Sequence, residues 1–297
     1  MDLPMDMVSE CIPCLVRQSL DALRRATPDE SRRLAGLRAA LRLLAEVTSQ
    51  PPPLTAAALQ ALICEHTSCA DPYQRDKEQT TRLALALLPH LREVVRLHPR
   101  PFEAACRLAV AGNIIDFGVA DHIAEDRVER ELADTLSGPF DTLAVGAFER
   151  LAQTSRRTLW LCDNAGEIVL DRLLIERLPT GSVTVAVKSG PALNDATLAD
   201  AMAAGLGDVS TVIETGAAIP GTVLAHCSPA FRQAFGEADL VVAKGQGNYE
   251  TLEREVRAPI VFLMKVKCGH VSRHTGLPMG TAAVVFSAAL AAENHSA

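Results

Sequence analysis

The sequence has few aromatic residues and lacks any long apolar segment. Phe, Trp and Tyr make up 4% of the 297 residues, with a single Trp and two Tyr. Proteins that bind single-stranded nucleic acids stack the bases on aromatic side chains, so this scarcity argues against that role. No window contains the roughly 18 consecutive apolar residues that a membrane-spanning helix needs. We therefore expect neither a nucleic-acid-binding protein nor a membrane protein.

Positive charge is also in short supply. The formal net charge is −7, which argues against a general polyanion partner, although one local basic pocket for a phosphate would be invisible in that sum. Residues 1–10 contain three acids and no base, unlike a secretory signal. We expect a cytoplasmic location, in which the eight cysteines are reduced thiols rather than a disulfide framework.

Three common functional motifs are missing from the sequence. The first predicted strand-to-helix connection contains no G-x-G-x-x-G, and no G-x-x-x-x-G-K-[ST] occurs anywhere. A serine nucleophile elbow is absent as well. The ordinary dinucleotide-binding, P-loop and serine-hydrolase interpretations therefore fail.

The first half of the chain has a helical pattern almost throughout. From residue 8 to about 150, apolar residues recur every three or four positions, prolines punctuate the segments, and β-branched runs are nearly absent. We predict an all-helical N-terminal region over residues 1–153. Its helices are expected at residues 8–26, 31–47, 55–66, 77–96, 101–111 and 126–136.

Around residue 154 the pattern changes to short β-branched runs that alternate with helical segments. This alternation is typical of βαβ units and a parallel sheet covered on both faces. We predict an α/β fold over residues 154–297, a Rossmann-like and mostly parallel sheet with helices on both faces. Its strands are expected at residues 158–162, 183–187, 210–214, 240–243 and 260–264, with a sixth at 282–286.

Polar side chains follow the first two of these strands. Asp163 and Asn164 come directly after the first, and Asp195 follows the second after a short turn. The carboxyl ends of parallel strands meet at one edge of a sheet, where ligands bind in open α/β folds. Carboxylate and amide oxygens are suitable ligands for a hard divalent cation. We therefore predict that these three side chains bind a metal ion.

Lysines and glycines follow strands of the same sheet. Lys188 or Lys265 could neutralise phosphoryl oxygens, and Gly245 and Gly247 would let the backbone approach an anion ahead of a helix N-terminus. Each feature alone is more often structural, because a lone Asp at a strand end is usually a helix cap and a lone Gly-x-Gly is usually a turn. The occurrence of acids, lysines and glycines at the same predicted edge of the sheet is what favours a functional site.

Two polar features of the helical half have competing interpretations. Asn113 and Asp116 interrupt an apolar stretch, either as part of a helix C-cap or as residues that line the predicted pocket. Cys11 and Cys14 form a C-x-x-C motif, which can bind zinc or cycle its redox state. No further ligands lie at a recognised finger spacing, so two thiols packed at the start of a helix are favoured.

Several ordered segments resemble the motifs of the metal-dependent damage-control phosphatases, a family long catalogued as domain of unknown function 89. The sequence is similar to the short stand-alone archaeal and bacterial branch, and the resemblance spans about residues 7 to 286. The segments in the second half are residues 163–167 (DNAGE), 188–197 (KSGPALNDAT), 244–252 (KGQGNYETL) and 263–268 (LMKVKC). Residues 11–14, 71–77 and 111–118 agree in the first half.

The resemblance implies a divalent metal such as Mn, Co, Ni or Mg at the sheet edge. Asp163, Asn164 and Asp195 fall on the metal ligands, and Glu167 matches a residue behind them. Positions near the substrate and its phosphate are matched by Asn113, Asp116, Lys188, Gly245, Asn248 and Lys265. Gln246 and Gly247 differ from branches with an acidic and a bulkier residue there, which leaves a preference for sugar phosphates open.

The resulting hypothesis is a metal-dependent phosphatase that hydrolyses phosphomonoesters of small phosphorylated metabolites, damaged ones included. Asp163 and Lys265 are the expected catalytic residues; whether Asp163 attacks phosphorus or only binds the metal stays open. One alternative is an S-adenosylmethionine-dependent carboxyl methyltransferase, against which the missing glycine-rich loop speaks. Another is a non-catalytic protein that binds a metal or metabolite.

Overall fold

The computed structural model describes residues 5–112, 134–179, 183–256, 258–288 and 290. Its centre is a six-stranded sheet with the strand order β3-β2-β1-β4-β5-β6. Every neighbouring pair is parallel except β5 and β6, which are antiparallel. The predicted mostly parallel α/β sheet is confirmed. The strands are β1 (Thr158–Leu161), β2 (Val183–Val187), β3 (Thr211–Glu214), β4 (Leu240–Lys244), β5 (Ile260–Lys265) and β6 (Ala282–Phe286).

The chain reverses its direction of travel across the sheet at β1. From β1 it proceeds outward through β2 to β3, and it then returns to place β4 on the other side of β1. In open α/β sheets, the carboxyl ends of the strands at such a switch point flank a crevice where ligands bind. The residues that follow β1 and β4 therefore face each other across the expected binding crevice.

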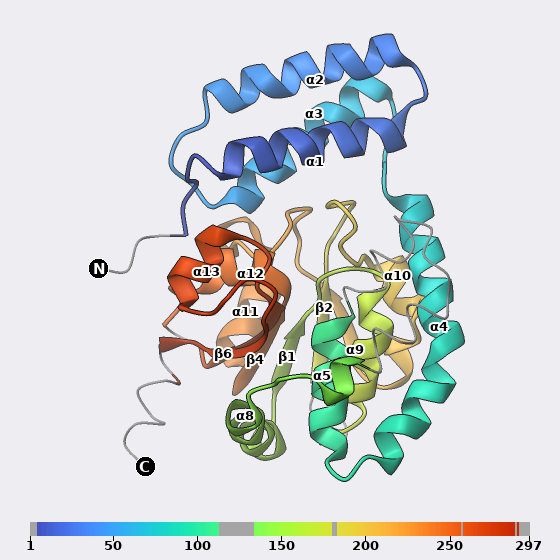
Figure 1. Ribbon diagram of the computed structural model, residues 1–297, viewed down its shortest axis with the longest axis vertical. Helices are drawn as coiled ribbons and strands as arrows, with labels where there is room; N and C mark the ends of the chain where they lie inside the picture. Colours follow the sequence, from blue (N-terminus) through green and yellow to red (C-terminus); the bar gives the residue numbers. More distant parts are fainter. Residues whose placement is uncertain (1–4, 113–133, 180–182, 257, 289, 291–297) are drawn as a thin grey trace.

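Helices cover both faces of the sheet because its strands alternate their buried side chains between two cores. In β1, Trp160 joins one core, while Leu159 and Leu161 join the other. The first core is covered by α4 (Gln74–Leu97), α5 (Pro101–Ala111), α8 (Thr142–Thr154), α9 (Glu167–Ile175) and α10 (Leu198–Ala203). The second is covered by α11 (Pro229–Glu237), α12 (Gly245–Leu252) and α13 (Gly269–Thr275). Figure 1 shows α11, α12 and α13 to the left of β1 and α4, α9 and α10 to the right of β2.

Three N-terminal helices form a separate layer, with apolar clusters of their own. They are α1 (Cys11–Ala26), α2 (Glu30–Ala45) and α3 (Pro52–Thr67), and they lie together at the top of Figure 1. The Asp29 carboxylate accepts from the backbone N–H groups of Ser31 and Arg32 and so caps α2. Pro52 begins α3, since proline is tolerated in the first turn of a helix.

The three-helix layer is attached to the loops that follow the strands. The Gln60 side chain of α3 accepts a hydrogen bond from the backbone N–H of Leu193, in the connection after β2. Leu193 also packs against the apolar clusters of the layer. His270 of α13 is hydrogen-bonded to the Asp6 carbonyl at 3.1 Å. These contacts place α1 and α3 over the carboxyl-terminal edge of the sheet, which carries the predicted site.

The helix predicted at residues 126–136 falls largely outside the described residues. The division of the chain at residue 153 stays a prediction, although α4 and α5 share one core with the sheet. Within the part of the chain that the structure describes, no helix is long and apolar enough to cross a membrane.

Candidate active site

Backbone hydrogen bonds tie together the two loops that carry the predicted metal ligands. The N–H of Ala196 donates to the Asp163 carbonyl at 2.8 Å, and the N–H of Ala165 donates to the Asn194 carbonyl at 3.0 Å. Asn164 and Asp195 form an antiparallel bridge between the loops. The segment after β1 is thereby fastened to the segment after β2. Asp163, Asn164 and Asp195 are brought to one place, as the sequence predicts.

The two aspartates lie buried at the wall of a single cavity of about 610 Å³. Asp163 is 8% exposed and Asp195 is 3% exposed. Burial, reinforced by the neighbouring Asp195 charge, raises the pKa of Asp163 well above its usual value. Burial also raises the pKa of Asp195 to about 6, although Lys188 opposes the shift. A bound cation would offset both the burial of these carboxylates and the repulsion that the Asp195 charge exerts on Asp163.

The donor atoms of this trio suit a hard cation. Among the described residues, the Asp195 Oδ2 atom is buried and has no hydrogen-bond partner, and the Lys188 Nζ atom lies 3.6 Å from it. The Asn164 amide donates its NH₂ group to the Asp163 and Glu167 carboxylates, which leaves its oxygen to accept. Nowhere in those residues do three or more His, Cys, Asp or Glu side chains form a metal-binding group. The predicted trio has two carboxylates and one amide, all oxygen ligands.

The Gly245 backbone packs directly against the Asp163 carboxylate. Its φ of +77° is a left-handed conformation that favours glycine. A Cβ atom at this position would lie 1.9 Å from the Asp163 Oδ2 atom. Gly247 lies in the same turn of α12 and lines the cavity. The sequence predicts that the Gly245 backbone approaches a substrate anion. In the structure it approaches the Asp163 carboxylate of the protein itself.

Asn248 and Lys188 stabilise the loops around the cavity. The Asn248 amide is fully buried; it donates to the Lys244 carbonyl at 2.7 Å and accepts from the Thr222 hydroxyl at 2.7 Å. Lys188 is buried and donates to the Gly221 carbonyl. Neither side chain belongs to the described lining of the cavity. Their predicted contact with substrate stays a prediction, while their contacts here hold the backbone.

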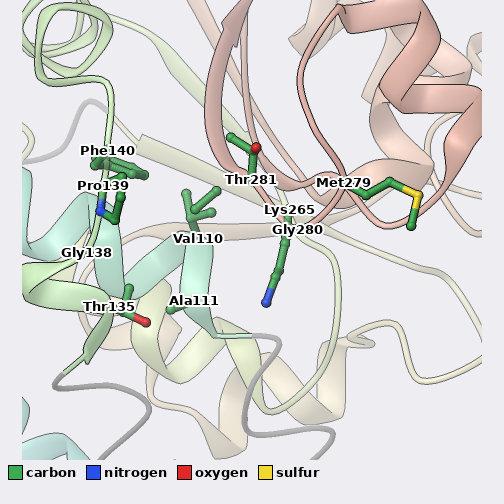
Figure 2. A pocket seen from close by; sticks show the side chains of 11 residues that line it. Val110, Ala111, Thr135, Gly138, Pro139, Phe140, Lys265, Met279, Gly280 and Thr281 are labelled. Carbon is green, nitrogen blue, oxygen red and sulfur yellow. The ribbon is translucent and has the colours of Figure 1, made fainter.

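Lys265 and Lys267 line different cavities. Lys265, the predicted catalytic lysine, lines a second cavity of about 420 Å³. Figure 2 shows its ammonium group between the end of α5, which carries Ala111, and the segment with Met279. Lys267 instead lines the cavity that contains Asp163 and Asp195, and its charge partly opposes the rise that burial causes in the pKa of both. The sequence contains this second lysine in the same Lys-Val-Lys motif, but nothing in the motif says which lysine faces the aspartates.

The N-terminal helices supply the wall opposite the aspartates. Cys11 and Cys14 lie at the start of α1 and line the cavity, and Cys11 is half-buried. Cys14 is exposed rather than packed, contrary to the favoured interpretation of the C-x-x-C motif. The apolar part of this wall consists of Leu15, Pro52, Pro53 and Ala56, and Leu193 of the connection after β2 also lines the cavity. Asn113 and Asp116, the predicted substrate residues of the helical half, lie outside the described residues.

A buried ion cluster lies behind the trio; the sequence analysis expects Glu167 there but misses Lys244 and Asp171. Lys244, the last residue of β4, contacts the carboxylates of Glu167 and Asp171 and donates to the Ala109 carbonyl at 2.9 Å. Burial, together with Glu167, raises the pKa of Asp171 to about 7, although Lys244 opposes the shift. The sequence signal for this cluster is a lysine at the end of an apolar, β-branched strand. Such a lysine is expected to be buried, and a buried ammonium group needs anionic or hydrogen-bonding partners.

Known proteins resemble this one over nearly the whole chain. The family description "Damage-control phosphatase ARMT1-like domain" matches residues 7–283. A damage-control phosphatase of Pyrococcus horikoshii is 34% identical over 278 residues, which cover 91% of this chain and 94% of the relative. A damage-control phosphatase of Archaeoglobus fulgidus is 31% identical over 277 residues, with 91% and 95% covered.

A solved structure agrees with the fold. The crystal structure of a DUF89 family protein from Pyrococcus horikoshii matches with a TM-score of 0.83 and 31% sequence identity. The match covers 95% of this chain and 98% of the other. The predicted resemblance is confirmed, and the chain belongs to the ARMT1-like family of damage-control phosphatases.

Proposed function

We propose that this chain is a divalent-metal-dependent phosphatase that hydrolyses phosphomonoesters of small phosphorylated metabolites, including damaged ones. The observation that carries the proposal is the pair of buried carboxylates, Asp163 and Asp195, at the wall of one cavity. Among the described residues, the Asp195 Oδ2 atom has an ion pair with Lys188 at 3.6 Å but no hydrogen bond. The names of its relatives support the phosphatase activity.

In this proposal Asp163, Asn164 and Asp195 hold the metal through oxygen atoms. Mn, Co, Ni and Mg are the candidate ions, because each accepts oxygen ligands. When bound, such an ion supplies Lewis-acid polarisation of a phosphoryl oxygen and lowers the pKa of a water molecule. The close packing of Gly245 on Asp163 fixes the carboxylate from behind.

Charge on the transferring phosphoryl group would be neutralised from the opposite side. We assign this role to Lys267, because it lines the same cavity as the aspartates. Gln246 and Gly247 line that cavity in the first turn of α12. The first turn of a helix has backbone N–H groups without intrahelical partners, which can bind an anion. Lys265, for which the sequence predicts this role, lines the other cavity.

The organic part of the substrate would lie against α1 and α3. Their apolar residues face the metal edge and would exclude water from the reacting group. The volume of about 610 Å³ is in the range of small-molecule sites. A cytoplasmic location belongs to the same proposal, and the eight free cysteines support it.

The test is release of phosphate from a generic aryl phosphate, with Mn, Co, Ni or Mg added in turn to metal-free protein. We expect activity with at least one ion, and its loss in Asp163→Ala and Asp195→Ala. Activity that survives in either variant would refute the assignment of the site. Inert wild-type protein across all four ions and a panel of phosphorylated metabolites would refute the function. No feature of the described site favours the methyltransferase alternative.

A further inference from the structure

One side chain behind the metal ligands is placed to control the direction of the Asn164 amide. An asparagine amide has a donor end and an acceptor end, and only the oxygen can bind a cation. The Asn164 NH₂ group donates to the Glu167 carboxylate at 3.1 Å and to the Asp163 carboxylate at 3.2 Å. With its NH₂ group between two carboxylates, the amide must turn its oxygen away from both.

Lys244 fixes the orientation of Glu167 in turn. The Glu167 Oε1 atom contacts the Lys244 ammonium, while its Oε2 atom accepts from Asn164. Lys244 is fully buried and is itself anchored to the Asp171 carboxylate and the Ala109 carbonyl. A Cβ atom on Gly112 would lie 2.6 Å from the Glu167 Cγ atom, so the end of α5 packs directly on this side chain. Glu167 therefore has little freedom to rotate.

We propose that Glu167, oriented by Lys244, is a positioning residue that holds the Asn164 amide with its oxygen toward the metal. The inference rests on the proposed function, because it concerns a ligand of the proposed ion. Outer partners of metal ligands fix the orientation of those ligands in many proteins. Here the partner acts on an amide, for which orientation decides whether the group binds a cation at all.

An isosteric substitution distinguishes positioning from packing. In Glu167→Gln, the new side-chain oxygen remains the better partner for the Lys244 ammonium, so the new NH₂ group faces Asn164. Two NH₂ groups cannot bond to each other, so Asn164 can bond to the new NH₂ group only by turning its oxygen toward it and away from the ion site, at the cost of its bond to Asp163. Asp171→Asn is the matched control, because it neutralises the other buried carboxylate on Lys244 without a recorded contact to Asn164.

The experiment measures Mn²⁺ affinity by calorimetric titration of metal-free protein, with the thermal shift on Mn²⁺ addition as a second readout. We expect Glu167→Gln to weaken Mn²⁺ binding by about 10- to 100-fold. Asp171→Asn should bind within about threefold of the wild type, since both variants disturb the same ion cluster but only one reverses the amide. Far-ultraviolet circular dichroism checks that all proteins are folded.

Rescue gives the sharpest test. A carboxylate has two equivalent oxygens, so Asn164→Asp in the Glu167→Gln background can accept from the new amide and still present an oxygen to the ion. We expect this double variant to recover most of the Mn²⁺ affinity. Equal binding by Glu167→Gln and wild type, equal loss in Asp171→Asn, or no rescue would each overturn the positioning role while leaving the proposed function intact. Absence of Mn²⁺ binding by the wild type would instead overturn the proposed function, and this inference with it.

Discussion

Replacement of Gly245 by alanine would move the Asp163 carboxylate without changing any charged group. The new methyl group would lie 1.9 Å from the Asp163 Oδ2 atom, whereas ordinary contacts begin near 3.4 Å. The carboxylate must therefore shift by about 1.5 Å, and a misplacement of about 1 Å can cost about 100-fold in rate. A second cost is the φ of +77°, which disfavours an L-residue by about 1 kcal/mol.

Gly276→Ala separates these two costs. Gly276 has a φ of +72°, and a Cβ atom there would meet nothing within 4 Å. Both variants should lose about 1 kcal/mol or more of unfolding free energy from the backbone term, measured by urea denaturation. Only Gly245→Ala should also lose Mn²⁺ affinity and show a fall in kcat/KM of about 100-fold, equivalent to about 2.7 kcal/mol of transition-state stabilisation.

The assay is hydrolysis of an aryl phosphate at saturating and at limiting Mn²⁺. If Gly245→Ala and Gly276→Ala have the same kcat/KM and the same Mn²⁺ dependence, the close approach of Gly245 to Asp163 has no part in catalysis. Gly245 would then have no role in positioning the Asp163 carboxylate.

Three further predictions concern charged groups around the cavity. Lys267→Met should lower kcat/KM by about 100-fold and Lys265→Met by far less, because of these two lysines only Lys267 lines the cavity of the aspartates. A larger loss of kcat/KM in Lys265→Met would assign the role to Lys265. Lys244→Met should reduce the free energy of unfolding by about 3 kcal/mol or more, since it leaves the Glu167 and Asp171 carboxylates buried without their cation. A urea midpoint equal to that of the wild type would contradict this prediction. Burial raises the pKa of Glu250 from 4.5 to about 7, so the folded state binds the proton more tightly and wild-type stability should fall as pH rises from 4.5 to 7. Glu250→Gln should remove about 2 kcal/mol of that fall between pH 5 and pH 8, and identical urea profiles for the two proteins would refute the pKa shift.

Much of the fold could be predicted from the sequence because its signals are local. The β-branched runs predict all six strands to within a residue or two of their observed ends, as the period of two and the flanking turns require. The convergence of Asp163, Asn164 and Asp195 is also predictable, since parallel strands bring their carboxyl ends to one edge. Asp163 and Asp195 thus meet although 31 residues separate them in the chain.

The direction of side chains beyond a strand end could not be predicted. Within a strand, alternation decides which face a residue occupies, but Lys265 and Lys267 lie where β5 ends and the period no longer applies. Lys244 ends its strand with its ammonium group in the interior, where tertiary partners override the preference of lysine for solvent. Such contacts come from packing of α5 and α9 on the sheet, which no local pattern encodes.

The most direct test of the central claim is Mn²⁺ binding to metal-free protein, measured by calorimetry for the wild type, Asp163→Asn and Asp195→Asn. We predict one Mn²⁺ ion per chain in the wild type, a loss of binding in both variants, and a parallel loss of aryl phosphate hydrolysis. Wild-type phosphatase activity without any bound divalent ion, or full binding by either variant, would contradict the account.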